Sequence, residues 1–101
     1  MNAPVLCRKA AERDLEAIED WYETQRKYLG LEFRSVVDKA VAQISIQPFL
    51  YHARYRELRR VILRRFPYAL WYRVQDDVII VVACIHGRRG RDYFKKRLGS
   101  A

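Results

Sequence analysis

The residues of this sequence best suited to chemistry lie in its last third, just after a strand-like apolar run. His86 and Gly87 end that run, and Arg88, Arg89 and Arg91 follow at once. A guanidinium is a planar fork of N–H donors that matches a carboxylate or a phosphate. We therefore predict that Arg88, Arg89 and Arg91 bind an anionic group of a target.

His86 allows two interpretations. Imidazole changes its charge near neutral pH, as a general base requires. Alternatively, the His-Gly pair shapes the end of the strand, and the ring packs or caps locally. We favour the second interpretation and keep His86 as a candidate base. His52 has no partner nearby in sequence and is expected on a surface loop.

Lys and Arg are concentrated in the second half of the chain. Residues 1–53 hold 7 Lys or Arg and 8 Asp or Glu, whereas residues 54–101 hold 13 and 4. This asymmetry indicates an anionic partner, and composition leaves open RNA, DNA or an acidic protein segment. The plainer alternative for the basic run at residues 59–65 is a solvated sheet face that protects an edge strand from aggregation.

Length and composition exclude several classes of protein. The 101 residues, 50% hydrophobic and 13% aromatic, predict one folded domain over residues 1–101 rather than a disordered basic tail. The longest apolar run, residues 78–85, is too short to span a bilayer, and residues 1–4 lack a signal-peptide pattern. We therefore expect a cytoplasmic protein without a membrane partner. Cys7 and Cys84 are interpreted as small buried side chains, and no metal site or cofactor is implied.

Two helical segments are expected in the first half. Apolar residues recur at helical spacing from Ala11 to Leu29, with acids in the first part and bases at the end, which suits the helix dipole. Gly30 is expected to break this helix. A second periodic run extends from Phe33 to Ile44 and stops before Pro48. The pattern predicts a helical hairpin joined at Gly30.

Most of the expected strands lie in the second half. The expected strands cover residues 3–8, 60–66, 68–74 and 78–85, with an irregular connection at 49–57 and a short helix at 90–98. The last strand is apolar on both faces and is expected inside the sheet. The order predicts an α+β fold, in which the helical hairpin packs on a mainly antiparallel sheet of about four strands.

Four motifs follow one another along nearly the whole chain. They are Ala-x-x-Asp-Leu-x-x-Ile at residues 11–18, Gly-x-x-Phe at 30–33, Arg-Phe-Pro-Tyr-x-x-x-Tyr at 65–72, and Ile-His-Gly-Arg-Arg at 85–89. In this order they resemble the RelE/ParE superfamily of toxins from bacterial type II toxin–antitoxin systems. The resemblance implies a cytoplasmic growth inhibitor that is neutralised by a cognate antitoxin, the product of the neighbouring reading frame.

The superfamily divides by target. RelE-like members cut mRNA on the ribosome, whereas ParE-like members block DNA gyrase and have no recognised catalytic chemistry. Cleavage without a metal needs a base, an acid and cations for the developing phosphorane charge. The resemblance places these roles on Arg60, Arg88 and, offset by one residue, Tyr93. Ala69 and Ile62 stand where the RelE-like pattern has cations. Because of the missing cation at Ala69 and the His-Gly-Arg-Arg strand end, we favour the gyrase target.

The resemblance also implies an antitoxin surface. Arg60 and Arg65 would receive acidic residues of the antitoxin. Trp71 alternates with Tyr72 along its strand, so it is expected either to be exposed or to lie under the antitoxin. We expect no sequence-specific DNA binding by this chain alone. An inactive module that only binds an antitoxin is a third alternative.

Overall fold

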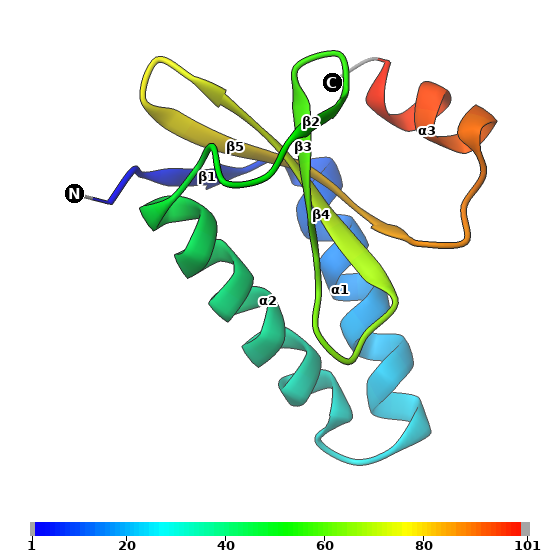
Figure 1. Ribbon diagram of the computed structural model, residues 1–101. Helices are drawn as coiled ribbons and strands as arrows, with labels where there is room; N and C mark the ends of the chain where they lie inside the picture. The colour runs from blue at the N-terminus through cyan, green and yellow to red at the C-terminus, as the bar shows by residue number, and fades with distance from the viewer. Residues whose placement is uncertain (1, 100–101) are drawn as a thin grey trace.

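The fold is a five-stranded sheet with helices on both faces. The computed structural model describes residues 2–99. In chain order its elements are β1 (Val5–Cys7), α1 (Lys9–Gln25), α2 (Leu29–Ile46), β2 (Ala53–Tyr55), β3 (Leu58–Ile62), β4 (Tyr68–Gln75), β5 (Val78–His86) and α3 (Arg91–Leu98), as Figure 1 shows. The predicted α+β class, helical hairpin and short C-terminal helix are confirmed.

The strand order in the sheet is β1-β5-β4-β3-β2. β1 runs parallel to β5, and the other three pairings are antiparallel, so the mainly antiparallel sheet is confirmed. The expected irregular connection at residues 49–57 is wrong in part, because Ala53–Tyr55 forms β2. This strand pairs with β3 at only two positions, which is too short a stretch to leave a periodic pattern.

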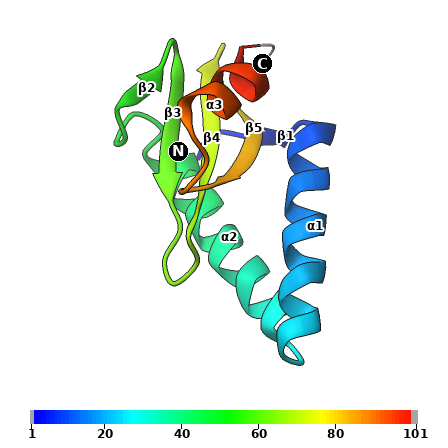
Figure 2. The same ribbon diagram turned by 90° about the vertical axis from the view of Figure 1, so that its right-hand side faces the viewer.

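α1 and α2 cover one face of the sheet, and Figure 2 shows them as a hairpin beside and below the strands, with the connection of the two helices at the bottom. Aromatic rings fill the space between the hairpin and the β3–β4 turn. Tyr22 of α1 lies 4.8 Å from Phe66, and Phe33 of α2 lies 5.3 Å from Phe66, between ring centroids. Aromatic pairs at these separations add to the stabilisation from burial. Phe66 and Tyr72 are both buried.

The helix junction lies earlier than Gly30. α1 ends at Gln25, and Tyr28 takes the left-handed conformation, with φ of 70°, before α2 begins at Leu29. Gly30 is inside the first turn of α2, where an added Cβ would lie 2.7 Å from the backbone oxygen of Glu19. The predicted break at Gly30 is therefore wrong. This glycine is needed because it lets α2 approach α1 closely.

α3 covers the opposite face of the sheet, over a second apolar cluster. β5 has a β-bulge on this part of the sheet. Trp71 pairs with Ala83 and Tyr72 with Val81, so Val82 is the extra residue of β5. The cluster contains Leu58, Trp71, Val82, Ala83, Ile85 and Leu98. Trp71 is only 3% exposed, so the first of its two expected alternatives, an exposed ring, is wrong.

The connection between β3 and β4 begins earlier than expected, because the predicted strand extended over residues 60–66. β3 ends at Ile62, and residues 63–67 form a turn in which Arg65 has φ of 70°. The turn closes where Leu63 N donates to Tyr68 O at 2.9 Å.

Within residues 2–99, no helix is long and apolar enough to cross a membrane.

Candidate functional site

The turn between β5 and α3 presents an exposed row of cations. Arg88, Arg89 and Arg91 are all exposed, and none of them forms an ion pair within residues 2–99. The guanidinium of Arg89 lies 4.4 Å from the centroid of the Tyr93 ring. These arginines are therefore exposed to solvent, and their binding to an anionic target stays a prediction.

His86 helps to shape this turn. Its Nδ1 accepts a hydrogen bond from the backbone N–H of Arg88 at 3.0 Å, and its ring meets the Tyr68 ring edge-on at 5.0 Å. A neutral imidazole that accepts at Nδ1 carries its proton on Nε2. This arrangement fits the favoured interpretation, in which the His-Gly pair forms the strand end.

A cavity of about 510 Å³ lies between the turn, α1 and α3. Its lining includes His86, Arg88, Arg89 and Tyr93, together with Asp14 of α1. Asp14 accepts hydrogen bonds from the backbone N–H of Cys84 at 3.0 Å and from Arg97 at 2.6 Å. Arg97 also donates to the Tyr93 hydroxyl at 3.0 Å. These bonds connect α3 to α1 and to the edge of β5.

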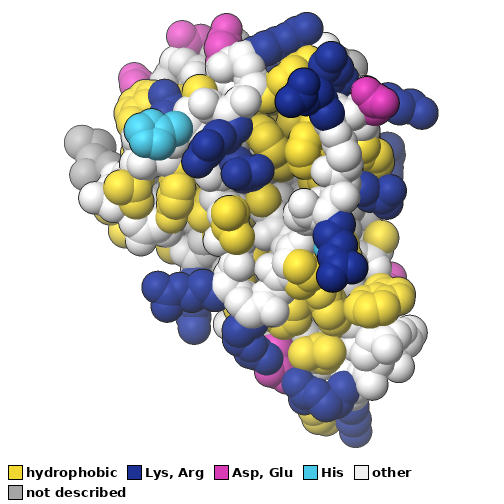
Figure 3. Space-filling view, turned by 45° about the vertical axis from the view of Figure 1, so that its right-hand side comes forward, with side chains coloured by type: hydrophobic (Ala, Val, Ile, Leu, Met, Phe, Trp, Pro, Cys, Tyr) yellow, Lys and Arg dark blue, Asp and Glu magenta, His cyan; other side chains and the backbone are white. Residues whose placement is uncertain are grey.

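Arg60 lies at a different cavity, of about 500 Å³, on the α3 face of the sheet. Its guanidinium covers the Trp71 ring at 5.6 Å, and Phe94 of α3 covers the same ring at 5.5 Å. Arg54, Arg91 and Lys95 complete the cationic lining. In the face that Figure 3 shows, Lys and Arg side chains border exposed hydrophobic ones. Trp71 is buried beneath Arg60 and Phe94, and its predicted contact with the antitoxin stays a prediction.

Arg65 lies at the end of a groove between α2 and β3, which we call the α2–β3 groove. Its volume is about 830 Å³, and its lining is Glu32, Ser35, Val36, Lys39, Ala40, Gln43, Tyr51, Val61, Ile62, Leu63, Arg64 and Arg65. Ile62 is 66% exposed. β2 pairs with β3 only as far as Arg59, so the outer edge of β3 is open along the groove.

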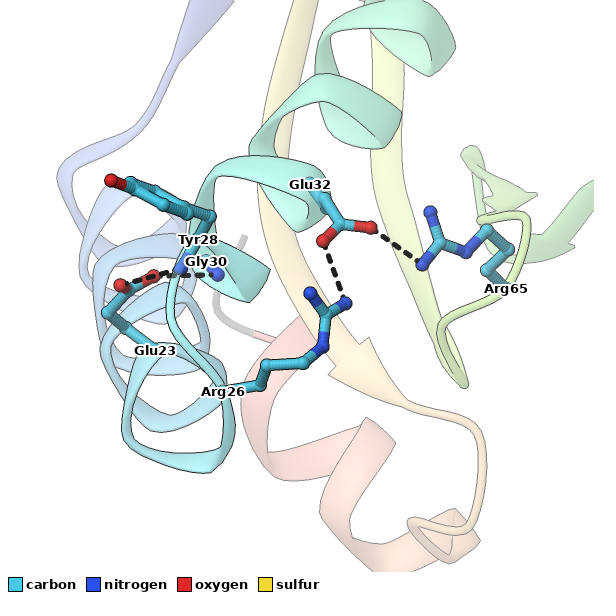
Figure 4. A network of polar contacts seen from close by, with 6 residues as sticks. All are labelled: Glu23, Arg26, Tyr28, Gly30, Glu32 and Arg65. Carbon is cyan, nitrogen blue, oxygen red and sulfur yellow. Dashed lines mark hydrogen bonds and ion pairs between the residues drawn. The ribbon is translucent and has the colours of Figure 1, made fainter.

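Glu32 and Arg65 of the groove take part in a polar network with Arg26, as Figure 4 shows. Glu32 Oε1 accepts from Arg65 Nη2 at 3.0 Å, and Glu32 Oε2 accepts from Arg26 Nη2 at 2.7 Å. These two bonds hold the pKa of Glu32 below its ordinary value, and the bond from Arg65 has the larger effect. Glu23 accepts from the backbone N–H groups of Tyr28 and Gly30, and so satisfies donors at the start of α2.

The motifs and this arrangement agree with a comparison against protein families. Residues 5–91 match the family described as ParE toxin of the type II toxin–antitoxin system parDE. The chain belongs to the ParE toxin family. The match spans most of the chain, from β1 to the first residue of α3, and it confirms the RelE/ParE resemblance. No curated protein sequence matches the toxin significantly.

Solved structures share the fold of the toxin. The chromosomal ParDE toxin–antitoxin system from P. aeruginosa contains a chain of 19% identity and TM-score 0.61, covering 83% of this toxin and 95% of that chain. The RelBE2 toxin–antitoxin complex from Mycobacterium tuberculosis contains one of 22% identity and TM-score 0.59, covering 85% and 99%. At this identity the likeness establishes the fold.

The residues predicted for a nuclease are divided between two cavities of the toxin. Arg88, Tyr93 and His86 line the cavity beside α1, whereas Arg60 lines the cavity on the α3 face. Among residues 2–99, no cluster of three His, Cys, Asp or Glu side chains is placed to hold a metal ion. The groove residues Glu32 and Lys39 were missed from the sequence, because each is unremarkable in its own segment, and Ile62 was noted there only for the cation that it replaces.

Cys84 should be unreactive in the folded toxin. Burial, and secondarily the charge of Asp14, raises the pKa of the Cys84 thiol from 9.0 to about 12. At pH 8 we expect iodoacetamide to label Cys84 only after denaturation, as measured by mass spectrometry of its peptide. Above pH 9 the unfolded thiol loses its proton while the folded one keeps it, so this group lowers stability as pH rises toward 12. Equal labelling of native and denatured toxin would contradict the buried placement.

Proposed function

We propose that this toxin inhibits growth by binding and blocking DNA gyrase, without catalysing a reaction. The observation that carries the proposal is the exposed row of Arg88, Arg89 and Arg91, which lacks acidic partners within residues 2–99. Because these guanidinium groups have no acidic partner within residues 2–99, they can pair with carboxylates of a protein target without first breaking an ion pair. Gyrase is a cytoplasmic enzyme, and we place the toxin in that compartment.

The arrangement of titratable groups also supports a non-catalytic role. A general base must lie within hydrogen-bond reach of the proton that it removes. His86 is already engaged at Nδ1 by the turn backbone. Arg60 is held over Trp71, at a cavity that does not include His86. Of the residues expected of a metal-independent nuclease, Arg60 therefore lies apart from Arg88, Tyr93 and His86, which share the cavity beside α1.

A ribosome-dependent mRNA endoribonuclease is the second candidate function. Its support is the α3-face cavity, where Arg54, Arg60, Arg91 and Lys95 surround partly exposed Tyr55 and Phe94 rings. Cations beside aromatic rings are the usual means of holding a single nucleic-acid strand. Under this alternative, Arg60 and Arg88 would stabilise the phosphorane, with Tyr93 or His86 transferring protons. Two assays separate the functions. A gyrase blocker inhibits the supercoiling of plasmid by gyrase, whereas a ribosome-dependent nuclease produces new mRNA ends on ribosomes.

We further propose that the cognate antitoxin binds in the α2–β3 groove. Exposed apolar side chains are the first support: Ile62 lies in the groove, and Ile46, Phe49 and Leu50 follow at the end of α2. Lys39, Arg64 and Arg65 give the groove a positive wall suited to acidic residues. The open edge of β3 offers backbone hydrogen bonds to an extended segment.

Ile62→Asp should weaken antitoxin binding by at least about tenfold, because it removes an apolar anchor and opposes an acidic partner. The measurement is the dissociation constant of the purified complex. Leu6→Asp is the matched control, since Leu6 is 60% exposed on β1 at the other edge of the sheet. Equal affinities of the two variants would place the antitoxin away from the groove.

A further inference from the structure

The α2–β3 groove has one acid among its cations. Lys39, Arg64 and Arg65 supply the positive charges of its lining, and Glu32 supplies the negative one. Neither Lys39 nor Arg64 forms an ion pair in the described part of the chain. Arg65, in contrast, is paired with Glu32 at 3.0 Å. One cation of the groove is therefore already occupied by a carboxylate of the toxin itself.

The β3–β4 turn has other means of holding its conformation. Phe66 is 6% exposed and packs against Tyr22 and Phe33, and a backbone hydrogen bond joins Leu63 to Tyr68. Exposed ion pairs add little to the stability of a fold. The Arg65 side chain is 57% exposed in its pair with Glu32. Structural support of the turn is thus a weak explanation for this bridge.

We propose that Glu32 takes the place of an antitoxin carboxylate, and that the bound antitoxin displaces it from Arg65. The inference rests on the proposed docking of an acidic antitoxin segment in the groove. The Arg65 guanidinium can donate to an incoming Asp or Glu carboxylate as it donates to Glu32. Glu32 therefore competes with the antitoxin for Arg65. Antitoxins that supply a carboxylate at Arg65 are favoured over those that do not.

The test is the affinity of purified toxin for the antitoxin encoded beside it, measured by isothermal titration calorimetry at constant ionic strength. Glu32→Gln keeps the size of the side chain and removes its charge, which releases Arg65. We expect the variant to bind about fivefold more tightly than wild type. Asp38→Asn makes the same charge change at an exposed position of α2 outside the groove, and it should alter affinity less than about twofold.

Arg65→Ala shows whether the gain passes through this guanidinium. In the Arg65→Ala background, Glu32→Gln should leave the affinity unchanged, because the competition no longer exists. A fivefold gain that persists without Arg65 would be a general charge effect and would overturn the inference.

Ile62→Asp in the same assay separates this inference from groove docking. If Ile62→Asp weakens binding while Glu32→Gln leaves it unchanged or weakens it, the antitoxin binds in the groove and Glu32 is not a competitor. If Ile62→Asp has no effect, the antitoxin binds elsewhere, and both proposals fail.

Discussion

Induced expression of this toxin alone should stop the growth of a bacterial culture, and co-expression of its antitoxin should restore growth. The expectation follows from membership of the ParE toxin family and from the exposed cations at Arg88, Arg89 and Arg91. Colony counts before and after induction measure the effect, with protein levels followed in the same cultures. We expect viable counts to fall by orders of magnitude without the antitoxin.

Ile62→Asp provides a matched control for this experiment. The variant changes the proposed antitoxin groove and leaves the β5–α3 turn intact, so it should stop growth even when the antitoxin is present. Leu6→Asp, at the other edge of the sheet, should be rescued like wild type. Abundant soluble wild-type protein in a culture that grows normally would contradict the proposed toxicity.

The double substitution Arg88→Ala and Arg89→Ala should abolish growth inhibition while the fold and antitoxin binding survive. Both side chains are exposed, and the hydrogen bond to His86 comes from the backbone of Arg88, which alanine retains. The loss of the Arg89–Tyr93 contact should cost about 1 kcal/mol or less. Growth on induction, thermal unfolding and antitoxin affinity are the three measurements.

Lys9→Ala with Arg13→Ala is the control for the loss of two positive charges. Both are exposed positions of α1, in the half of the chain that is close to neutral. This variant should remain toxic. A double arginine variant that unfolds would assign Arg88 and Arg89 a structural role, and a folded variant that stays toxic would move the active surface elsewhere.

Local sequence patterns predicted the elements whose signal is contained in one segment. Helical spacing located α1 and α2, and the β-branched run at residues 78–85 located β5 inside the sheet. Gly30 misled the prediction, because glycine both ends helices and lets helices approach closely. Here the second use applies, and Tyr28 supplies the left-handed residue at the junction.

The groove and the cavities could not be predicted from the sequence, because they depend on contacts between segments that are distant along the chain. Glu32 and Arg65 are 33 positions apart, and Asp14 and Arg97 are 83 positions apart. Trp71 was expected either to be exposed or to lie under the antitoxin, yet it packs in the apolar cluster beneath α3. Exposed arginines of the β5–α3 turn were predictable, because a Gly-bounded basic stretch after an apolar strand has little reason to be buried.

The most direct test of gyrase blocking is the supercoiling of relaxed plasmid by purified gyrase in the presence of purified toxin. We expect wild-type toxin to inhibit supercoiling, equimolar antitoxin to relieve the inhibition, and the Arg88→Ala/Arg89→Ala variant to have no effect. The same wild-type toxin should leave mRNA on translating ribosomes uncut. Full supercoiling in excess toxin, together with mRNA cleavage at the ribosomal A site that Arg88→Ala slows, would contradict the account and establish the nuclease instead.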